Sequence, residues 1–388
     1  MKIKSLVIIA LLGSLALQIG CSVNPVTGEQ NFNVLGTQQE IALGERQYQP
    51  GQQSQGGAYD LDPDLTSYVR DMGLTLASVS DNRALAYDFV VLNNDVPNAW
   101  ALPGGKIAIN RGLLYLLEDE SELAAVLAHE IVHAAASHGA QQLSQGILLQ
   151  AGMEIVQHNT DHASHTALAG LGAALWQARY SREHEFQSDE YGMQYMAFAG
   201  YDPQGAVRLQ QKLLALAKEK NASGLSTLFA SHPPSQARIT ANQQHALSLP
   251  PGKRYKDRFQ KATAKIRRDK PAYDLFTKAQ QAHAKKNYSS ALELVNSAIQ
   301  KRPQEAHFYL LRGDIYQKRN QKSQALINYN RAIEANPSYF RSWLLRGLLH
   351  QEMGKNSFAE KDLERSQSLL PTKAATEALR QLRSNTPQ

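Results

Sequence analysis

The sequence predicts an α+β domain with a small β-sheet, followed by an all-α solenoid of helical repeats. In the first two thirds of the chain, short strand-like runs lie between stretches with helical spacing of apolar residues. In the last third, Pro303, Pro337 and Pro371 recur at intervals of 34 residues. A length of 388 residues and a hydrophobic fraction of 43% are sufficient for two globular domains.

The first residues have the composition of a secretory signal. Lys2 and Lys4 precede an apolar run over residues 6–17, which is too short for a comfortable membrane span. We therefore assign residues 1–21 to a signal peptide and expect the mature chain in the periplasm.

Cys21 is the only cysteine in the chain, so the fold has no internal disulfide. Its position directly after Gly20 favours a bacterial lipoprotein signal, although Gln18 stands where such signals carry Leu. The alternative is an ordinary cleaved signal with an incidental cysteine. With a lipid on Cys21, Ser22 in place of an inner-membrane retention Asp favours the outer membrane as the site of anchoring.

The α+β domain is assigned to residues 22–250. Helix-forming stretches show apolar residues three and four apart, strand-like runs end in turn-forming Asn, Asp, Pro or Gly, and Gly200 is a natural helix terminator. The Gln- and Gly-rich stretch over residues 49–62 is predicted to be a loop. The predicted elements are helices over 38–48 and 64–78, strands over 87–92, 99–102 and 107–109, helices over 118–137 and 182–199, and a long Ala/Gly-rich helical region between these two that ends near Tyr180.

The evenly spaced prolines predict tetratricopeptide repeats over residues 272–373, because 34 residues is the period of that repeat. Small residues occupy the pattern positions where paired helices must approach closely, for example Gly313 and Ala325. Such repeats stack into a superhelix with a concave surface that binds a protein partner. The remaining residues, 374–388, are assigned to a tail.

Between the two domains we expect a basic linker, residues 251–271. Nine Lys or Arg side chains lie between Lys253 and Lys270, against two Asp. A solvated linker is the plainer interpretation, and contact with an anionic membrane surface is the alternative. No nucleic-acid motif accompanies the charge, and the net charge of +6 is modest, so nucleic acid is not an expected partner.

The strongest chemical signal is His129-Glu130-Ile131-Val132-His133, an HExxH pattern within a predicted helix. Two histidines four residues apart share one helix face and can hold one metal ion. Glu130 is placed to take a proton from a water molecule at that ion. The surrounding residues are apolar, so a polar triad there needs a functional reason. We predict a site for one Zn²⁺ per chain.

A zinc peptidase needs three protein ligands. A metzincin would place the third at position 139, which is Gly139, and His138 is out of register by one. The stretch from Ser181 to Gly192 offers Glu185 and Asp189 four residues apart on one helix face, with Asp189 suited to support a ligating imidazole. Spacing alone does not show whether the ligand is Glu185 or one of its neighbours, Glu183 and His184.

These motifs together resemble the HtpX/CAAX-prenyl-protease family of gluzincins. The resemblance rests on HExxH, on Ser181-Arg182-x-x-Glu185-x-x-x-Asp189, on Asn98-Ala99-Trp100-Ala101-Leu102-Pro103-Gly104-Gly105, and on His232-Pro233 followed by Arg238. It covers about residues 24–245 and implies a zincin-like metallopeptidase domain. By the resemblance, Glu185 is the third zinc ligand and Asp189 supports a ligand from outside the metal shell.

Further roles are assigned to residues around that centre. Glu130 is the general base, and His232 is either the donor that stabilises the oxyanion or a fourth zinc ligand that holds the enzyme latent. Arg238 is a weaker candidate for the oxyanion donor and a substrate-binding residue. Asn98, Ala99 and Trp100 belong to a strand that either pairs with an extended substrate or forms a plain structural hairpin.

A peptidase domain followed by repeats is similar in layout to periplasmic proteases that act on outer-membrane β-barrel assembly. It implies an endopeptidase that degrades misfolded or stalled outer-membrane proteins, with repeats that recruit unfolded envelope proteins or the assembly machinery. The rival hypothesis is a chaperone or adaptor for outer-membrane protein assembly that acts through the repeats with little proteolysis.

Overall fold

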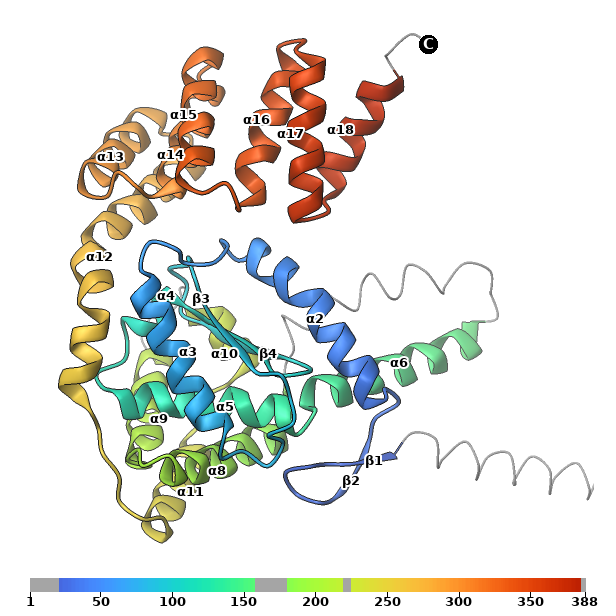
Figure 1. Cartoon of the computed structure of the whole chain (residues 1–388), viewed down its shortest axis with the longest axis vertical. Helices are drawn as coiled ribbons and strands as arrows, with labels where there is room; N and C mark the ends of the chain where they lie inside the picture. The colour runs from blue at the N-terminus through green and yellow to red at the C-terminus, as the bar shows by residue number, and fades with distance from the viewer. Residues whose placement is uncertain (1–20, 158–179, 219–224, 385–388) are drawn as a thin grey trace, which may run out of the picture. The chain divides into compact units, whose positions relative to one another are not determined.

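The computed structural model describes residues 21–157, 180–218 and 225–384, and they divide into two compact units (Figure 1). The first unit combines residues up to Tyr48 with Leu65–Val91 and Val96–Lys261. The second combines Gln49–Asp64, Leu92–Asp95 and residues from Ala262 onward. The predicted signal apart from Cys21, and the Ala/Gly-rich region between Gln157 and Tyr180, lie outside the described residues.

The chain begins with a short antiparallel hairpin of β1 (Cys21–Val23) and β2 (Gln30–Phe32). Two helices follow, α2 (Thr37–Ser54) and α3 (Pro63–Ala77). The buried residues of α3 recur every three or four positions, because one face of the helix is packed against the core. The hairpin and α3 from Leu65 onward belong to the first unit, whereas the last turns of α2 belong to the second.

The main sheet has three strands in the order β3 (Asp88–Leu92), β5 (Lys106–Asn110), β4 (Ala99–Leu102). β4 and β5 are antiparallel and pair Ala99 with Ile109. Gly104 and Gly105 connect them with φ of +80° and +83°, the left-handed region that suits glycine. Among the described strands, β4 therefore has one neighbour only and forms an edge of the sheet.

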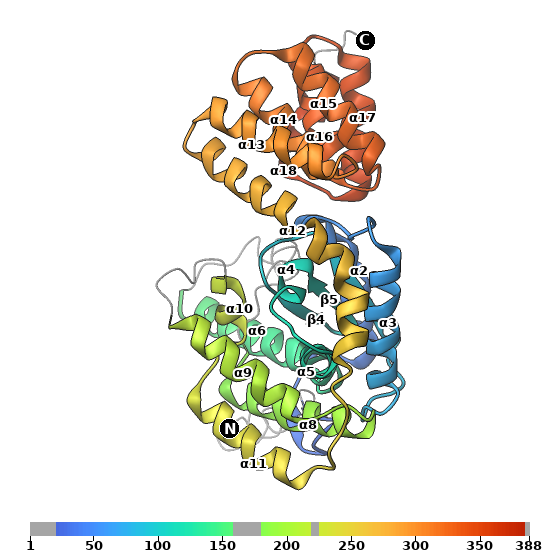
Figure 2. The same cartoon turned by 90° about the vertical axis from the view of Figure 1, so that its left-hand side faces the viewer.

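Helix α5 (Glu120–Ala135) is the centre of the first unit, and every residue in it except His129 is buried. It packs between strands β4 and β5 on one side and helices α8 (Arg182–Phe198) and α9 (Gln204–Ala217) on the other (Figure 2). The remaining helices of this unit are α4 (Arg111–Leu114), α6 (His138–Gln157), α10 (Ser226–Ser231) and α11 (Gln236–Ser248).

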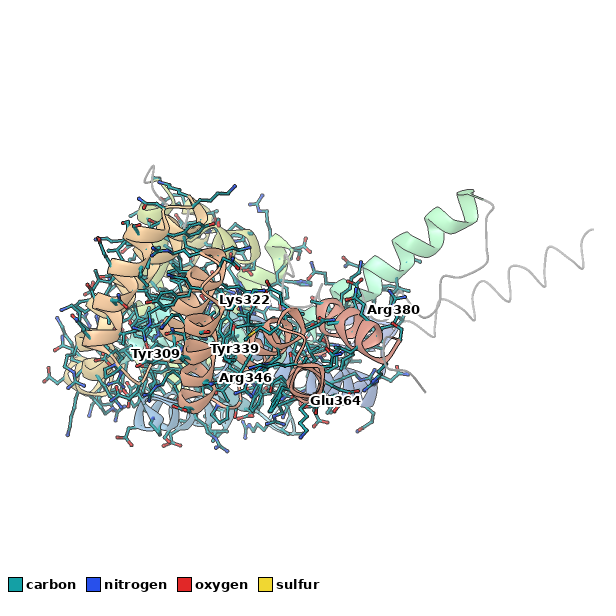
Figure 3. The ribbon with its side chains drawn as sticks, turned by 90° about the horizontal axis from the view of Figure 1, so that it is seen from above. Tyr309, Lys322, Tyr339, Arg346, Glu364 and Arg380 are labelled. Atoms are coloured by element: carbon teal, nitrogen blue, oxygen red, sulfur yellow. The ribbon has the colours of Figure 1, made fainter. Side chains whose placement is uncertain are left out.

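The second unit is built from antiparallel helix pairs, as the repeat period predicts. Gly313 and Gly347 show why small residues recur in it: a Cβ atom on them would lie 2.5 Å from the Tyr329 ring and 2.9 Å from Leu363. Arg346, labelled in Figure 3, ties two pairs together through Asp362 at 2.7 Å and Asn330 at 2.9 Å. The helices are α12 (Lys256–Ala284), α13 (Tyr288–Lys301), α14 (Ala306–Lys318), α15 (Lys322–Ala335), α16 (Phe340–Glu352), α17 (Asn356–Leu369) and α18 (Lys373–Ser384).

Three segments differ from the expectation from sequence. Residues 251–271, expected to be a linker, lie largely within the continuous helix α12. Residues 374–388, expected to be a tail, contain most of α18, whose Ala375 and Leu379 are buried against the preceding helix. The predicted loop over 49–62 begins as the last turns of α2, because the Gln53 side chain bonds to the backbone of Ser338 and Phe340 within the second unit.

Candidate metal centre and active-site cleft

Two buried helices bring the candidate ligands together. Asp119 caps the N-terminus of α5, where its carboxylate accepts the Glu122 N–H at 3.1 Å. Ser181 caps α8, where its hydroxyl accepts the His184 N–H at 3.1 Å. The two helices approach closely at Gly192, where an added Cβ would lie 3.3 Å from the backbone nitrogen of His129. Residues one helical turn apart on each helix therefore face the same point.

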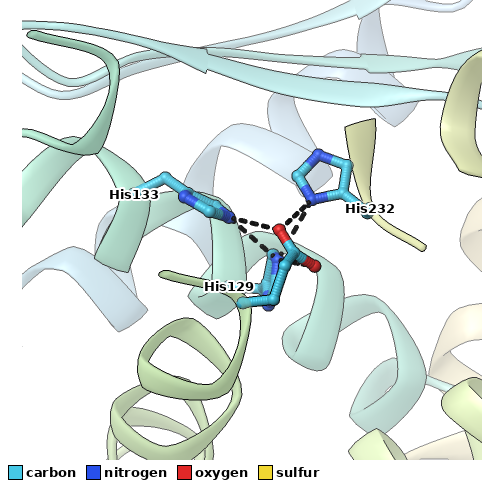
Figure 4. Close-up of side chains that lie close together, drawn as sticks. His129, His133 and His232 are labelled. Atoms are coloured by element: carbon cyan, nitrogen blue, oxygen red, sulfur yellow. Dashed lines mark hydrogen bonds and ion pairs between the residues drawn. The ribbon is translucent and has the colours of Figure 1, made fainter. Parts of the chain in front are cut away.

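At that point the side chains of His129, His133, Glu185 and His232 converge, and the three imidazoles are shown in Figure 4. One donor atom from each residue lies within 4.8 Å of all the others. The Nε2 atoms of His129 and His133 are 3.0 Å apart, and Glu185 Oε1 lies 3.3 Å from His133 Nε2. The structure brings Glu185 to this cluster, whereas Glu183 is exposed and His184 bonds to Gln141.

These separations fit one tetrahedral metal ion. Metal–ligand bonds of about 2.0–2.1 Å, the usual values for zinc with imidazole and carboxylate ligands, place the vertices of a tetrahedron about 3.3 Å apart. His232 Nδ1 is 3.0 Å from Glu185 Oε1 and 3.3 Å from His129 Nε2, so it is close enough to two of the donor atoms to share an ion with them. The donor set of three imidazoles and one carboxylate is typical of zinc sites.

A second layer of charged groups holds the ligands in place. Asp189 accepts from His129 Nδ1 at 3.1 Å and from two guanidinium nitrogens of Arg238 at 2.7 Å. Burial opposes the charged form of Asp189, but Arg238 outweighs it and lowers the pKa of Asp189. Likewise burial opposes the charged imidazole of His129, but Glu185 and Asp189 raise the pKa of His129 to about 10. A buried carboxylate therefore contacts the ring nitrogen of His129 that points away from the ligand cluster.

Arg238 is better described as a positioning residue than as a substrate-binding residue. Its Nη1 lies 2.5 Å from Glu185 Oε2 and donates to the carbonyl of Pro233 at 3.2 Å. Together with the bonds to Asp189, these contacts occupy all three nitrogens of the guanidinium. This corrects the sequence-based assignment, because the side chain is buried and committed to the carboxylates of the site.

Glu130 lies beside the ligand cluster with 2% of its surface exposed. Its Oε1 is 3.5 Å from His232 Nε2, and its Oε2 is buried without a hydrogen-bond partner. Burial raises the pKa of Glu130, while the nearby imidazoles of His232 and His129 oppose that change. A buried carboxylate with a free oxygen next to a metal site has the properties of a general base.

His138 has a place in the site that the spacing argument missed. Its Nδ1 lies 2.9 Å from Nδ1 of His133, and its Nε2 lies 2.5 Å from Gln187 Oε1. Because His133 presents Nε2 to the ligand cluster, its Nδ1–H donates to His138, which in turn donates from Nε2–H to Gln187. Burial and the neighbouring His184 lower the pKa of His138 to about 3, in keeping with a neutral imidazole that accepts this hydrogen bond.

We expect His138→Ala to weaken zinc binding about 10- to 100-fold, because the imidazole that orients His133 is lost. The measurement is competition with a chromophoric zinc chelator, and His283→Ala in the repeats serves as the matched control. An affinity equal to that of the wild type would show that the contact between His138 and His133 does not support the ligand.

The edge strand β4 contributes to the cleft through one residue. Ala99 lines the cleft beside His129 and Glu130, whereas Asn98 and Trp100 do not. Side chains alternate along a strand, and Trp100 instead meets the ring of Tyr48, with centroids 6.2 Å apart. The Asn98 carbonyl accepts the Asn110 N–H at 2.8 Å and Trp100 is paired with Ala108, so the backbone of both residues faces β5, and the backbone of Ala99 faces the free edge.

Cys21, the predicted lipidation site, is the first residue of strand β1 and pairs with Phe32. In the part of the chain that the structure describes, none of the helices combines the length and the hydropathy needed to cross a bilayer.

Comparison with known proteins agrees with this geometry. Residues 63–246 match Peptidase family M48, and residues 313–354 match the TPR repeat. The Beta-barrel assembly-enhancing protease of Escherichia coli (strain K12) is 27% identical over 239 residues, which cover 58% of this chain and 48% of that protein. The Mitochondrial metalloendopeptidase OMA1 of Schizosaccharomyces pombe is 31% identical over 177 residues, which cover 45% of this chain and 51% of that protein. The chain spans about half the length of the curated relatives it matches.

Proposed function

We propose that this chain is a zinc endopeptidase of the bacterial envelope, because residues 63–246 match Peptidase family M48 and residues 313–354 match the TPR repeat. It binds one zinc ion and degrades misfolded or stalled outer-membrane proteins, and its repeats recruit the substrate or the assembly machinery. The substrate class comes from the name of the relatives called Beta-barrel assembly-enhancing protease.

The observation that carries the proposal is the placement of Glu130 beside four converging ligands in a cleft that an edge strand borders. A zinc ion held by His129, His133 and Glu185 would supply Lewis acidity for a scissile carbonyl and would lower the pKa of a bound water molecule. Glu130 accepts the proton of the attacking water and returns it to the leaving amine. The backbone of β4 pairs with an extended, unfolded substrate and aligns the peptide along the cleft.

We place His232 as a regulatory fourth ligand in the resting enzyme. Its Nδ1 is close to the other donor atoms, and its Nε2 is close to Glu130 Oε1. The imidazole therefore lies between the ligand cluster and the base, where the attacking water must enter. A resting state of this kind would protect native envelope proteins from an enzyme that acts on unfolded chains.

Zinc binding at residues His129, His133 and Glu185 and anchoring at Cys21 complete the proposal. A lipid on Cys21 would hold the domain at the periplasmic face of the outer membrane, where β-barrel proteins are inserted. An extended substrate and a membrane-bound enzyme would then meet at the site of assembly.

The alternative function is that of a chaperone or adaptor that binds envelope proteins through its repeats with little proteolysis. It is favoured by the tetratricopeptide match over residues 313–354, since such repeats present a concave surface to protein partners. The two functions differ in whether the substrate is cut or only bound.

The test is incubation of the purified zinc-loaded chain, from residue 22 onward, with a urea-diluted outer-membrane β-barrel protein and with the same protein folded in detergent. We expect fragments from the unfolded form only, and no fragments after removal of the metal by a chelator. Binding of the unfolded form without fragments, by both the wild type and the His232→Ala variant, would favour the chaperone function instead.

A further inference from the structure

The ring of Tyr180, in the segment directly before α8, packs on the ligand His133. The two ring centroids are 3.7 Å apart and the ring planes are inclined by 21°, so the rings are stacked. The same tyrosine ring has its centroid 5.5 Å from that of His232. The active-site cleft borders the ligand cluster at His129, Glu130 and His232. Tyr180 therefore borders the same cluster at His133, next to the imidazole that is proposed to keep the enzyme latent.

The first turn of α8 fixes the position of Tyr180 relative to the ligands. The Ser181 hydroxyl accepts the His184 N–H at 3.1 Å, and the Ser181 carbonyl accepts the N–H of the ligand Glu185 at 3.1 Å. The side chain of Tyr180 is partly exposed, and its hydroxyl has no hydrogen-bond partner among the described residues. A hydroxyl that is free to donate is therefore attached to a ring that contacts the ligand cluster.

Peptide hydrolysis needs a donor for the negative charge that forms on the scissile carbonyl oxygen when water adds to the carbonyl carbon. Two other polar side chains beside the ligands have their donors engaged. Arg238 uses all three guanidinium nitrogens on carboxylates and on a backbone carbonyl, and His138 donates to Gln187. His232 is placed as a ligand of the resting enzyme, so it leaves before the substrate binds. The hydroxyl of Tyr180 has neither of these commitments.

From this placement we infer that Tyr180 is a further catalytic residue, whose hydroxyl donates a hydrogen bond to the oxyanion of the tetrahedral intermediate. The water oxygen bonds to the carbonyl carbon, the π electrons of the carbonyl move to its oxygen, and Glu130 takes the water proton. Tyr180 keeps its own proton, since a phenol is neutral at neutral pH. Burial, and then the carboxylates of Glu130 and Glu185, raise the pKa of Tyr180 further.

This inference rests on the proposed function and deepens it. Because the rings of Tyr180 and His232 are neighbours, the imidazole of the latent enzyme occupies space beside the tyrosine ring. Departure of His232 opens that space to the carbonyl oxygen of the substrate. The stack on His133 meanwhile holds the tyrosine ring in place, so the donor is positioned before the substrate arrives.

The test is Tyr180→Phe, which removes the hydroxyl and keeps the ring that stacks on His133. Cleavage of a quenched peptide is measured in the otherwise wild-type chain and in the His232→Ala background, where the centre is open. We expect kcat to fall about a hundredfold, KM to change less than about twofold, and the affinity for zinc to stay unchanged. The matched control is Tyr191→Phe, a partly exposed tyrosine of α8, which should keep the kcat of its parent.

Binding of a phosphinic peptide gives a second readout, which does not depend on turnover. Its phosphinate copies the two oxygens of the tetrahedral intermediate, and analogues of this kind gain affinity from interactions made only in the transition state. By calorimetry on the zinc-loaded chain, Tyr180→Phe should weaken the phosphinic peptide by about the same factor as kcat/KM falls. Added to Glu130→Gln, the same substitution should leave the affinity for the uncut peptide unchanged.

Values of kcat/KM and of phosphinate affinity within about twofold of the parent would overturn the inference. A fall in kcat that follows a loss of zinc would also count against it, because Tyr180 would then act only by holding His133. Weaker phosphinate binding in Tyr180→Phe without cleavage by any variant, His232→Ala included, would support the donor and contradict the peptidase. Cleavage at equal rates with and without the hydroxyl would do the reverse.

Discussion

Glu130→Gln will lower kcat/KM for peptide cleavage by about a thousandfold or more while the metal content stays at one ion per chain. The amide keeps the shape of the side chain but cannot accept the proton of the attacking water, and general base catalysis contributes about 10²- to 10⁴-fold. Glu130 is not among the converging donor atoms, so zinc affinity should not depend on it. The measurement is cleavage of a quenched peptide, with zinc determined by mass spectrometry on the same samples.

The control is Glu118→Gln, an exposed carboxylate that precedes α5. Because His232 is proposed to hold the resting enzyme latent, the substitution of Glu130 is tested both alone and together with His232→Ala. Cleavage by the Glu130→Gln, His232→Ala double variant at the rate of His232→Ala alone would exclude Glu130 as the base.

Much of the fold was predictable because local patterns and tertiary packing agree. The predicted helix over 182–199 is observed as α8 over Arg182–Phe198, and the strand over 99–102 is observed as β4. Periodic burial and turn chemistry determine both elements. The prediction failed where contacts between residues far apart in the sequence determine the secondary structure. The Gln-rich end of α2 is helical because the Gln53 side chain bonds to the backbone of Ser338 and Phe340. No local sequence pattern predicts such contacts.

The site shows the same division. The spacing within HExxH and between Glu185 and Asp189 places pairs of residues on single helix faces, and the structure brings those faces together. The spacing argument considers only residues that could bind the metal themselves, so it gives His138 no role. The contact between His138 and His133 depends on the turn that follows α5. Ser137 takes φ of 57° in that turn, and the chain then brings His138 back toward the ligand. The cleft beside His129 likewise depends on how α5, α8 and α9 pack together, which no single stretch of sequence reports.

His232→Ala will raise kcat/KM for an unfolded substrate at least tenfold, with zinc retained. Two imidazoles and a carboxylate remain as ligands, which is the usual set of a catalytic zinc site with one open position. The loop that carries His232 is held firmly: its backbone N–H donates to the Leu228 carbonyl at 2.8 Å, and Arg238 bonds to the carbonyl of Pro233. Removal of the imidazole alone should therefore open the position without displacing Asp189 or Glu185.

The competing role for His232 is donation of a hydrogen bond to the oxyanion. It predicts that His232→Ala lowers the activity instead of raising it. Loss of such a donor lowers kcat by about 10²- to 10³-fold. His245→Ala, a change on α11 outside the ligand cluster, controls for a general effect of losing a histidine. Activity that falls in His232→Ala with zinc retained would assign His232 to transition-state stabilisation. Activity that rises would show that substrate must displace His232 before cleavage begins, which makes access to the metal the regulated step.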